Sequence, residues 1–254
     1  MRIVACFKAA PDAQDIQVKP GGELDLARAV PKIGAYDLVA IEAARQLADQ
    51  VGGEVVGLTA GDPATCAGPK LRKDALSRGL DRLVTAPVEA GAELDSLQTA
   101  SVLAAAINQI GEVDLVLCGA GSSDQYNQQV GGLLGALLGW PALNAVASLA
   151  PGGPGVGATV VVDRALEDST QVVEVALPAS LSVTSGINTP RIPGMRDILA
   201  AGKKAVDEAP GVAPGAGARV LATRAPDQAE RAAKVLEAAP DAMALELAAF
   251  LKAN

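Results

Sequence analysis

The 254-residue chain contains no histidine. This absence excludes enzymes in which histidine activates a serine or cysteine nucleophile, and it excludes zinc or haem sites with histidine ligands. It also removes the usual general base near neutral pH. The sequence therefore argues against acid–base or nucleophilic catalysis by the protein alone.

Aromatic residues and cysteines are also scarce. Aromatic residues make up 2% of a chain that is 50% hydrophobic, so the core must consist mainly of Ala, Val, Leu and Ile. The three cysteines, Cys6, Cys66 and Cys118, are isolated in or beside apolar segments, which predicts reduced thiols in the core. Because the first residues also lack the layout of a signal peptide, we expect a cytoplasmic protein.

Long apolar runs and basic surfaces are missing as well. No apolar run reaches the roughly 18–20 residues of a membrane span, so we expect no membrane insertion. The formal net charge of −8, without a basic and aromatic-rich face, argues against binding to nucleic acid. A chain of this length forms one large or two small domains with a substantial core.

Short apolar strands and helices alternate over the first two-thirds of the chain. We expect strands at residues 2–7, 53–58, 82–85 and 114–118, and helices at 35–51, 67–79, 94–110 and 130–138. This alternation predicts an α/β fold with a mostly parallel, Rossmann-like sheet and helices on both faces. Ligands bind beyond the carboxyl ends of such strands, where the loops 8–12, 60–66, 85–89 and 119–129 converge.

The pattern changes after residue 158. Three strands follow without intervening helices, at residues 159–163, 171–175 and 179–183. Such a run predicts a hairpin or meander that extends the sheet in antiparallel fashion.

The C-terminal region has a different composition. Residues 209–218 are rich in Gly, Ala and Pro, which is typical of a linker; residues 219–223 could form a short strand and residues 227–237 a helix. A last helix at 241–251 is apolar almost all round and needs a partner surface. We therefore divide the chain into an α/β domain (1–206) and a linker with a C-terminal arm (207–254).

The loop at 119–129 is unusually polar. Seven of its side chains are amides, hydroxyls or a carboxylate: Ser122, Ser123, Asp124, Gln125, Asn127, Gln128 and Gln129. A glycine-rich loop between a strand and a helix places backbone N–H groups where a phosphate can bind. The loop therefore indicates a site for a polar ligand or a subunit contact, with a solvated surface loop as the alternative.

Several segments together resemble one family. Leu177-Pro-Ala-Ser-Leu-Ser-Val183, Ile187-Asn-Thr-Pro-Arg191 and Ile198-Leu-Ala-Ala-Gly-Lys-Lys204 resemble the β subunit of electron transfer flavoproteins, with its "P-A-V", "L-N-E-P-R" and "I-M-x-A-K-K" motifs. Earlier motifs follow in the same order: Lys8–Asp12, Gly61–Cys66, Leu71–Arg82 and Leu138–Pro141. The resemblance covers about residues 1–206, and its strength lies in the collinear set.

The resemblance implies an electron carrier and not an enzyme. The family's β subunit pairs with an α subunit that holds the redox-active FAD, and the pair carries electrons between flavin-dependent dehydrogenases, such as an acyl-CoA dehydrogenase, and an acceptor. The β subunit usually binds a structural AMP, whereas in the bifurcating branch an FAD occupies that place. A chain without histidine suits this division, because a cofactor supplies the chemistry.

The resemblance also implies which residues bind the nucleotide. They are Cys6 and Lys8 on the adenine side, Gly34 and Tyr36 in the place of the family's "N-P-F-D", Cys66 beside the adenosine, and Gly119, Ser122, Ser123, Asp124, Asn127, Gln128, Gln129, Val130 and Gly131 in the polar loop. Gly34 replaces an asparagine, so that side-chain contact is lost.

The polar loop fits neither form of the family completely. The AMP form reads "D-D-D-C-N-Q-T-G" and the bifurcating form "D-G-D-T-A-Q-V-G". Without a gap, Asp124, Gln129 and Gly131 match both forms, and Val130 matches only the second. A shift by one residue places Asn127 and Gln128 on the "N-Q" of the AMP form. We expect AMP, with FAD as the alternative.

A second functional element is the expected recognition loop at 191–200. In the family this loop anchors the dehydrogenase through an exposed leucine, and here Met195 stands at that position, between Arg191 and Arg196. Methionine suits pockets of differing shape. The alternative is that Met195 packs within its own domain. The resemblance further implies that the C-terminal arm wraps around the α subunit.

Two other classes share this kind of sheet. A nucleotide-binding module of the universal-stress-protein type would carry "G-x-x-G-x(9)-G-[ST]", and that spacing is not found after Cys118. An ATP-using ligase would carry an "S-G-G-x-D-S" type loop, which is absent. The sequence thus favours the carrier subunit.

Overall fold

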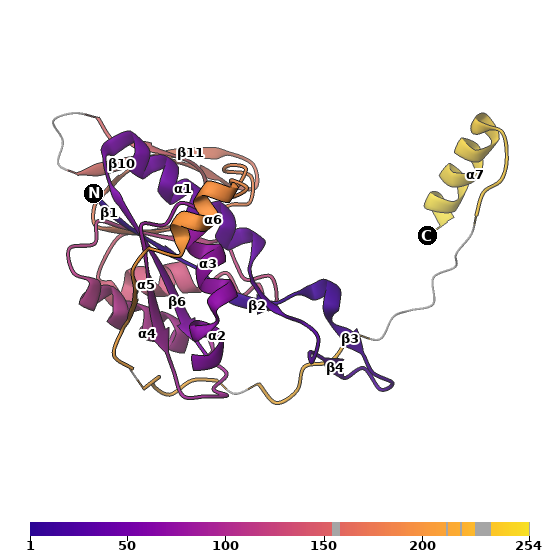
Figure 1. Cartoon of the computed structure of the whole chain (residues 1–254). Coiled ribbons are helices and arrows are strands. Elements are labelled where there is room, and N and C mark those ends of the chain that lie inside the picture. Colours follow the sequence, from indigo (N-terminus) through magenta and orange to yellow (C-terminus); the bar gives the residue numbers. More distant parts are fainter. Residues whose placement is uncertain (154–157, 212, 219, 227–234, 254) are drawn as a thin grey trace.

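The computed structural model describes residues 1–153, 158–211, 213–218, 220–226 and 235–253. Within these residues the main sheet has nine strands in the order β11-β10-β9-β12-β8-β1-β6-β7-β13, with helices on both faces (Figure 1). The strands are β1 (Arg2–Cys6), β6 (Glu54–Gly61), β7 (Arg82–Pro87), β8 (Leu115–Gly119), β9 (Ala142–Pro151), β10 (Thr159–Ala165), β11 (Thr170–Ala176), β12 (Ala179–Val183) and β13 (Val206–Glu208). The predicted α/β fold class is confirmed.

Alternate residues of the central strand β1 pack on opposite faces of the sheet. Ile3 and Ala5 lie in one core cluster with α1 (Ala35–Val51) and α3 (Pro69–Ser77). Val4 and Cys6 lie in a second cluster with α4 (Ser96–Ile110) and α5 (Val130–Leu138). Because both faces are covered, a ligand can reach the central strands only from their ends.

Two helices end at the predicted residues, each followed by a glycine in the left-handed conformation. Gly52 follows α1 with φ 73°, and Gly139 follows α5 with φ 70°. Glycine adopts this conformation without the penalty of a Cβ, so both predicted helix ends are confirmed.

The predicted helix over residues 67–79 is instead two helices. Asp62 accepts the N–H groups of Ala64 and Thr65 and caps α2 (Pro63–Ala67). Gly68 then separates α2 from α3, which starts at Pro69. Proline lacks an N–H and fits the first turn of a helix, so Pro69 begins a helix and does not merely interrupt one.

The antiparallel extension is confirmed in part. β10 and β11 form the predicted hairpin, and β10 pairs with β9, a strand that the sequence analysis missed. The third predicted strand, β12, lies between β8 and β9 and runs parallel to both, so the alternative of a three-stranded meander is wrong. All residues of β12 are buried, as a central strand requires.

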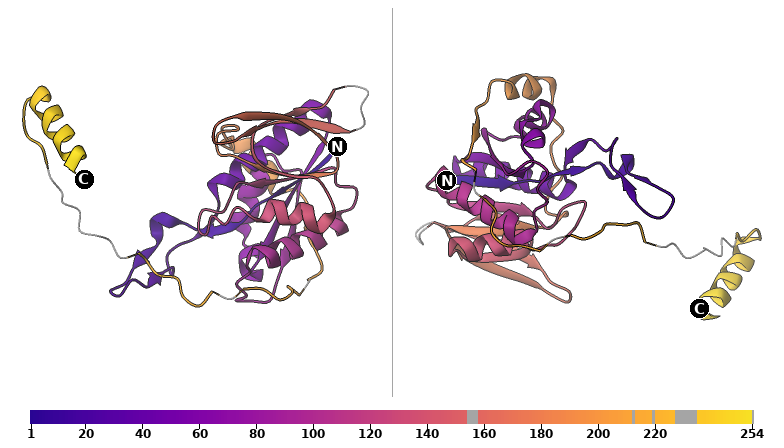
Figure 2. Two further views of the ribbon diagram at one scale, coloured as in Figure 1. Left: turned by 180° about the vertical axis from the view of Figure 1, so that it is seen from behind. Right: turned by 90° about the horizontal axis from the view of Figure 1, so that it is seen from below.

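Residues 9–33 form an unpredicted extension. In the described chain they contain two small antiparallel pairs, β2 (Ala9–Pro11) with β5 (Pro31–Ile33) and β3 (Gln17–Val18) with β4 (Leu24–Asp25). A short 3-10 helix, Ala13–Asp15, lies between β2 and β3. The β3–β4 hairpin projects away from the sheet (Figures 1 and 2).

The C-terminal region differs from a free linker. β13 pairs with β7, so the sheet continues past residue 206. The described part of the following segment, residues 209–211, 213–218 and 220–226, which we call the strap, reaches the β3–β4 hairpin, where Glu23 and Arg224 form an isolated bridge. The described residues 220–223 form no strand, and residues 227–234 of the predicted helix lie outside the described residues.

The last predicted helix is present as α7 (Pro240–Ala253). It stands apart from the sheet in all three views (Figures 1 and 2). No helix among the described residues is long and apolar enough to cross a membrane.

Candidate functional site

Three predicted segments meet at the carboxyl end of β1 and β8. The Nζ of Lys8, just after β1, lies 2.6 Å from Oδ2 of Asp124 in the polar loop. The backbone N–H of Lys8 donates to Asp37 in the first turn of α1, at 2.7 Å. Burial raises the pKa of Asp124, but its bonds to Lys8 and Ser122 outweigh this effect and leave the pKa below its ordinary value. The edge is therefore held together by one cation and two carboxylates.

Gly119 allows the segments to come this close. A Cβ on Gly119 would lie 2.7 Å from the carbonyl oxygen of Tyr36 and from Oδ1 of Asp37. A Cβ on Gly34 would lie 3.6 Å from Oγ of Ser123, which is an ordinary contact distance. The structure thus brings together predicted residues from β1, α1 and the polar loop.

Asp37 is a residue that the sequence analysis missed. Its buried carboxylate accepts the backbone N–H groups of both Lys8 and Gly119. Burial raises its pKa to about 7, against the opposing effect of these two bonds. The sequence carried a signal for it, because Asp37 stands at the aspartate of the family's "N-P-F-D" motif, although it was not among the predicted nucleotide residues.

The polar loop is folded around an aromatic pair. The chain has two tyrosines, and they meet here, with the ring centroids of Tyr36 and Tyr126 separated by 5.1 Å. A Cβ on Gly121 would lie 2.6 Å from the Tyr126 ring, so Gly121 makes room for it. Tyr126 and Gln128 have φ values of 49° and 58°, a left-handed backbone that costs about 1 kcal/mol or more at each non-glycine residue.

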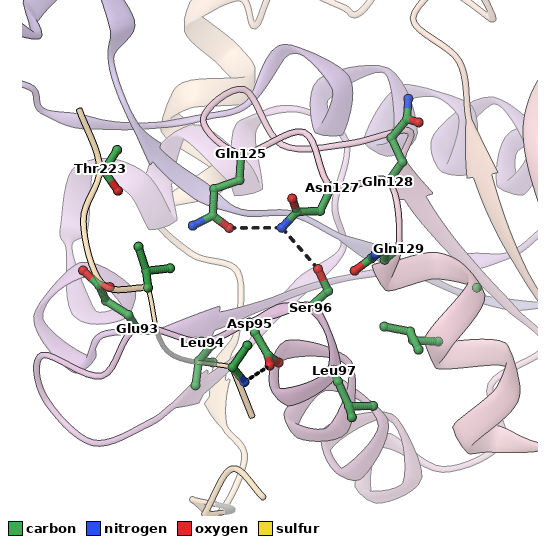
Figure 3. Close-up of a pocket in the computed structure, with 14 residues that line it drawn as sticks. Glu93, Leu94, Asp95, Ser96, Leu97, Gln125, Asn127, Gln128, Gln129 and Thr223 are labelled. Carbon is green, nitrogen blue, oxygen red and sulfur yellow. Dashed lines mark hydrogen bonds between the residues drawn. The ribbon is translucent and has the colours of Figure 1, made fainter. Parts of the chain in front are cut away.

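The second half of the loop faces a pocket of about 930 Å³ (Figure 3). The pocket lies between the N-terminal ends of α4 and α5, and Ala218, Val220 and Thr223 of the strap line one side. The amide of Asn127 donates to Oγ of Ser96 at 3.3 Å and to Oε1 of Gln125 at 3.4 Å. The volume of the pocket is near the upper end of the range of about 300–1,000 Å³ for small-molecule sites.

The predicted nucleotide residues do not all line this pocket. Asn127, Gln128 and Gln129 line it, whereas Lys8 and Asp124 pair with each other at the other side of the loop. Cys66 lines a separate cavity of about 520 Å³ with Arg72 and Glu208.

Cys6 and Cys118 are buried near the ends of β1 and β8. The thiols of Cys6 and Cys118 share a hydrogen bond, which together with burial raises the pKa of Cys6 well above its ordinary value. Burial raises the pKa of Cys66 to about 11. All three thiols are free and buried, as predicted.

Gly131 contributes to packing. A Cβ there would clash with Oγ of Ser182 on β12, and its carbonyl accepts a hydrogen bond of 2.8 Å from Oγ of Ser180. The next residue, Gly132, lines the pocket and has open space at its Cβ position. Of these two glycines, Gly132, which the sequence analysis did not single out, is the one that faces the pocket.

The segment expected to be the recognition loop, residues 191–200, is irregular in its first part and helical in the rest. Residues 191–194 are irregular, and Met195 begins α6 (Met195–Ala201). Met195 is 73% exposed, so it does not pack into its own domain, and Arg196 is exposed as well. Arg191 instead binds the buried Glu42, with Nε 2.6 Å from Oε2 and Nη2 3.1 Å from Oε1.

Comparison with known protein families agrees with this architecture. Residues 24–213 match the electron transfer flavoprotein domain. The chain belongs to the electron transfer flavoprotein family. The domain indicates a subunit of an electron carrier that works in a heterodimer, and proteins of this family bind flavin or another nucleotide. The family resemblance is thereby confirmed at the level of the domain.

The residues at the carboxyl edge fit a nucleotide. Asn127, Gln128 and Gln129 offer amide groups beside the first turn of α5, whose N–H groups can bind a phosphate. The carboxylate of Asp95 on the opposite wall accepts the N–H groups of Gln98 and Ala218, which lower its pKa and compensate its charge. Among the described residues no group of three or more potential metal ligands comes together.

Proposed function

We propose that this chain is the β subunit of a heterodimeric electron transfer flavoprotein. Helix α7 carries the proposal. Its residues Leu245 and Leu251 are 74% and 67% exposed on a helix that stands apart from the sheet (Figure 1). Apolar side chains in such a position require a partner surface, which the FAD-holding α subunit supplies.

The β subunit holds a structural AMP at the carboxyl edge of the sheet. Asn127, Gln128, Gln129 and the first turn of α5 bind its phosphate. The redox chemistry of the carrier is supplied by the flavin of the α subunit. This chain positions the ligand. FAD at the same place is the alternative, favoured by Val130 and by the size of the pocket.

The second partner is a flavin-dependent dehydrogenase. Ile192, Met195 and Leu199 are exposed together on the segment that ends in α6, at 92%, 73% and 66%. Glu42 fixes the base of this segment through Arg191. A segment that is held in place by an ion pair and exposes apolar side chains suits docking of a partner.

Co-expression with an FAD-binding α subunit tests the subunit assignment. We expect a 1:1 heterodimer, and mass spectrometry of the denatured complex should find FAD together with AMP. Replacing Leu245 and Leu251 by Glu should abolish the heterodimer, whereas Lys252→Glu on the same helix should not. A stable monomer whose α7 already resists hydrogen exchange would overturn the assignment.

A further inference from the structure

Beyond its first residue, Ala209, whose N–H donates to the carbonyl of Thr85, the strap is fastened to the domain at two further places. Near its start, the carbonyl of Gly215 accepts from Nε2 of Gln98 at 2.8 Å, and the N–H of Ala218 donates to Oδ2 of Asp95 at 2.6 Å. Near its end, the N–H of Ala225 donates to the carbonyl of Gly22 at 2.8 Å. The strap is therefore held against the domain by defined bonds, although its composition is that of a linker.

The first fastening uses a helix cap. Oδ1 of Asp95 accepts the N–H of Gln98, and Oε1 of Gln98 accepts the N–H of Asp95, which together form the capping box of α4. Each side chain then has one polar atom left, Oδ2 of Asp95 and Nε2 of Gln98. Both of these atoms bind the strap. The same two residues thus begin the helix and hold the strap.

Two glycines of the strap differ sharply in their surroundings. A Cβ on Gly217 would clash with the carboxamide of Gln98 and would lie 2.7 Å from Oδ2 of Asp95. A Cβ on Gly215 would meet nothing within 4 Å. Close contact between the strap and the capping box therefore requires glycine at 217 but not at 215.

Between the two fastenings the strap forms a wall of the 930 Å³ pocket. Ala218, Val220 and Thr223 line the pocket together with Asn127 and the other amides of the polar loop. Thr223 lies on the side away from Gln128 and Gln129 (Figure 3).

We propose that this pocket holds the adenine nucleotide of the subunit and that the strap, fastened by Asp95 and Gln98, retains it. The amides of the polar loop bind the phosphate. Ser96 and Thr223 offer hydroxyls to the ribose, and Leu97, Leu133 and Val220 form the apolar surface for the base. The ligand leaves only when the strap detaches. This inference rests on the proposed nucleotide function.

The test compares the two glycines in the complete complex. Radiolabelled AMP bound to the heterodimer is chased with unlabelled AMP, and the same is done with FAD. Gly217→Ala should release the label at least tenfold faster than the wild type, whereas Gly215→Ala should stay within twofold. Gln98→Glu gives a second test, because glutamate preserves the capping box but loses the donor to Gly215. It should release the label faster with an unchanged thermal midpoint.

The outcomes distinguish failure of the strap's proposed role from failure of the proposed nucleotide function. If the wild type holds neither AMP nor FAD, the nucleotide function itself is wrong, and the inference is wrong with it. If the wild type holds one of them and both Gly217→Ala and Gln98→Glu release it at the wild-type rate, only the role of the strap is wrong.

Discussion

The backbone N–H of Lys8 donates to the carboxylate of Asp37 at 2.7 Å, and the same carboxylate accepts the N–H of Gly119. One buried side chain thereby joins the end of β1, the first turn of α1 and the end of β8. These are the segments from which the polar loop and Lys8 extend. Asp37 consequently fixes the base of the polar loop without lining the pocket itself.

Asp37 should make stability depend on pH. Its pKa in the folded protein, about 7, is above the ordinary value of 3.8, so the folded protein binds this proton more tightly than the unfolded chain. Its contribution to the free energy of unfolding is therefore largest below pH 4 and is lost as the pH rises through 7. Between pH 5 and pH 8 the loss amounts to about 2–3 kcal/mol, at 1.36 kcal/mol per pKa unit.

Asp37→Asn checks this expectation. Urea unfolding at pH 5 and pH 8 measures the difference for the wild type and the variant. The difference should be smaller in the variant by about 2–3 kcal/mol, because asparagine does not titrate. The variant should also be less stable at pH 5, since its NH₂ group faces one of the two N–H donors. Equal pH dependence in both proteins would contradict the assignment of the raised pKa.

Neighbouring glycines at the start of α5 should respond in opposite ways. Gly131→Ala should lower the free energy of unfolding by about 1–3 kcal/mol, because its Cβ would clash with Ser182 on β12. Gly132→Ala has open space and should raise stability by about 0.5–1 kcal/mol through helix propensity. Denaturant unfolding measures both. If Gly131→Ala were as stable as Gly132→Ala, α5 could not pack on β12 as described.

The variants Gly131→Ala and Gly132→Ala also distinguish an effect on folding from an effect on nucleotide binding. Gly132 lines the pocket, whereas Gly131 is buried against the sheet. Gly132→Ala should thus weaken AMP binding even though the fold gains stability, as isothermal titration of AMP would show. Unchanged affinity in this variant would indicate that the ligand stays away from the first turn of α5.

The sequence predicted best where local chemistry decides the structure. Helices α1 and α5 were predicted residue for residue, because the glycines after them set their ends through a left-handed backbone. The hairpin of β10 and β11 followed from two strands with a short connection.

Long-range pairing could not be predicted in the same way. β12 lies between β8 and β9 because both of its faces and edges can be buried there, and no local pattern marks that position. β9 was missed because Ala142–Pro151 is rich in alanine and has few β-branched residues. The role of Asp95 in holding the strap was hidden for a related reason, since a capping box explains that residue completely within its own helix.

The ion pair between Arg191 and Glu42 should support the recognition segment. Arg191→Ala leaves a buried carboxylate without its cation and should cost about 2–3 kcal/mol, somewhat less than a fully buried pair because Arg191 is partly exposed. Arg196→Ala, on the exposed start of α6, should change stability by no more than about 0.5 kcal/mol. Combining Arg191→Ala with Glu42→Gln should recover part of the loss. Similar melting temperatures for the two arginine variants would show that the pair contributes little.

Met195 should affect docking and leave folding unchanged. Its side chain is 73% exposed, so Met195→Ala should leave the melting temperature nearly unchanged, whereas a core methionine would cost about 2–5 kcal/mol. An anchor residue truncated at an interface typically costs about 1–3 kcal/mol, which is about ten- to a hundredfold in affinity for the dehydrogenase. Steady-state KM for the dehydrogenase and the flavin spectrum of the heterodimer measure the two effects. Arg196→Ala serves as the control for a neighbouring exposed residue without an apolar tip. If Met195→Ala changed the KM no more than Arg196→Ala did, the dehydrogenase would have to dock elsewhere.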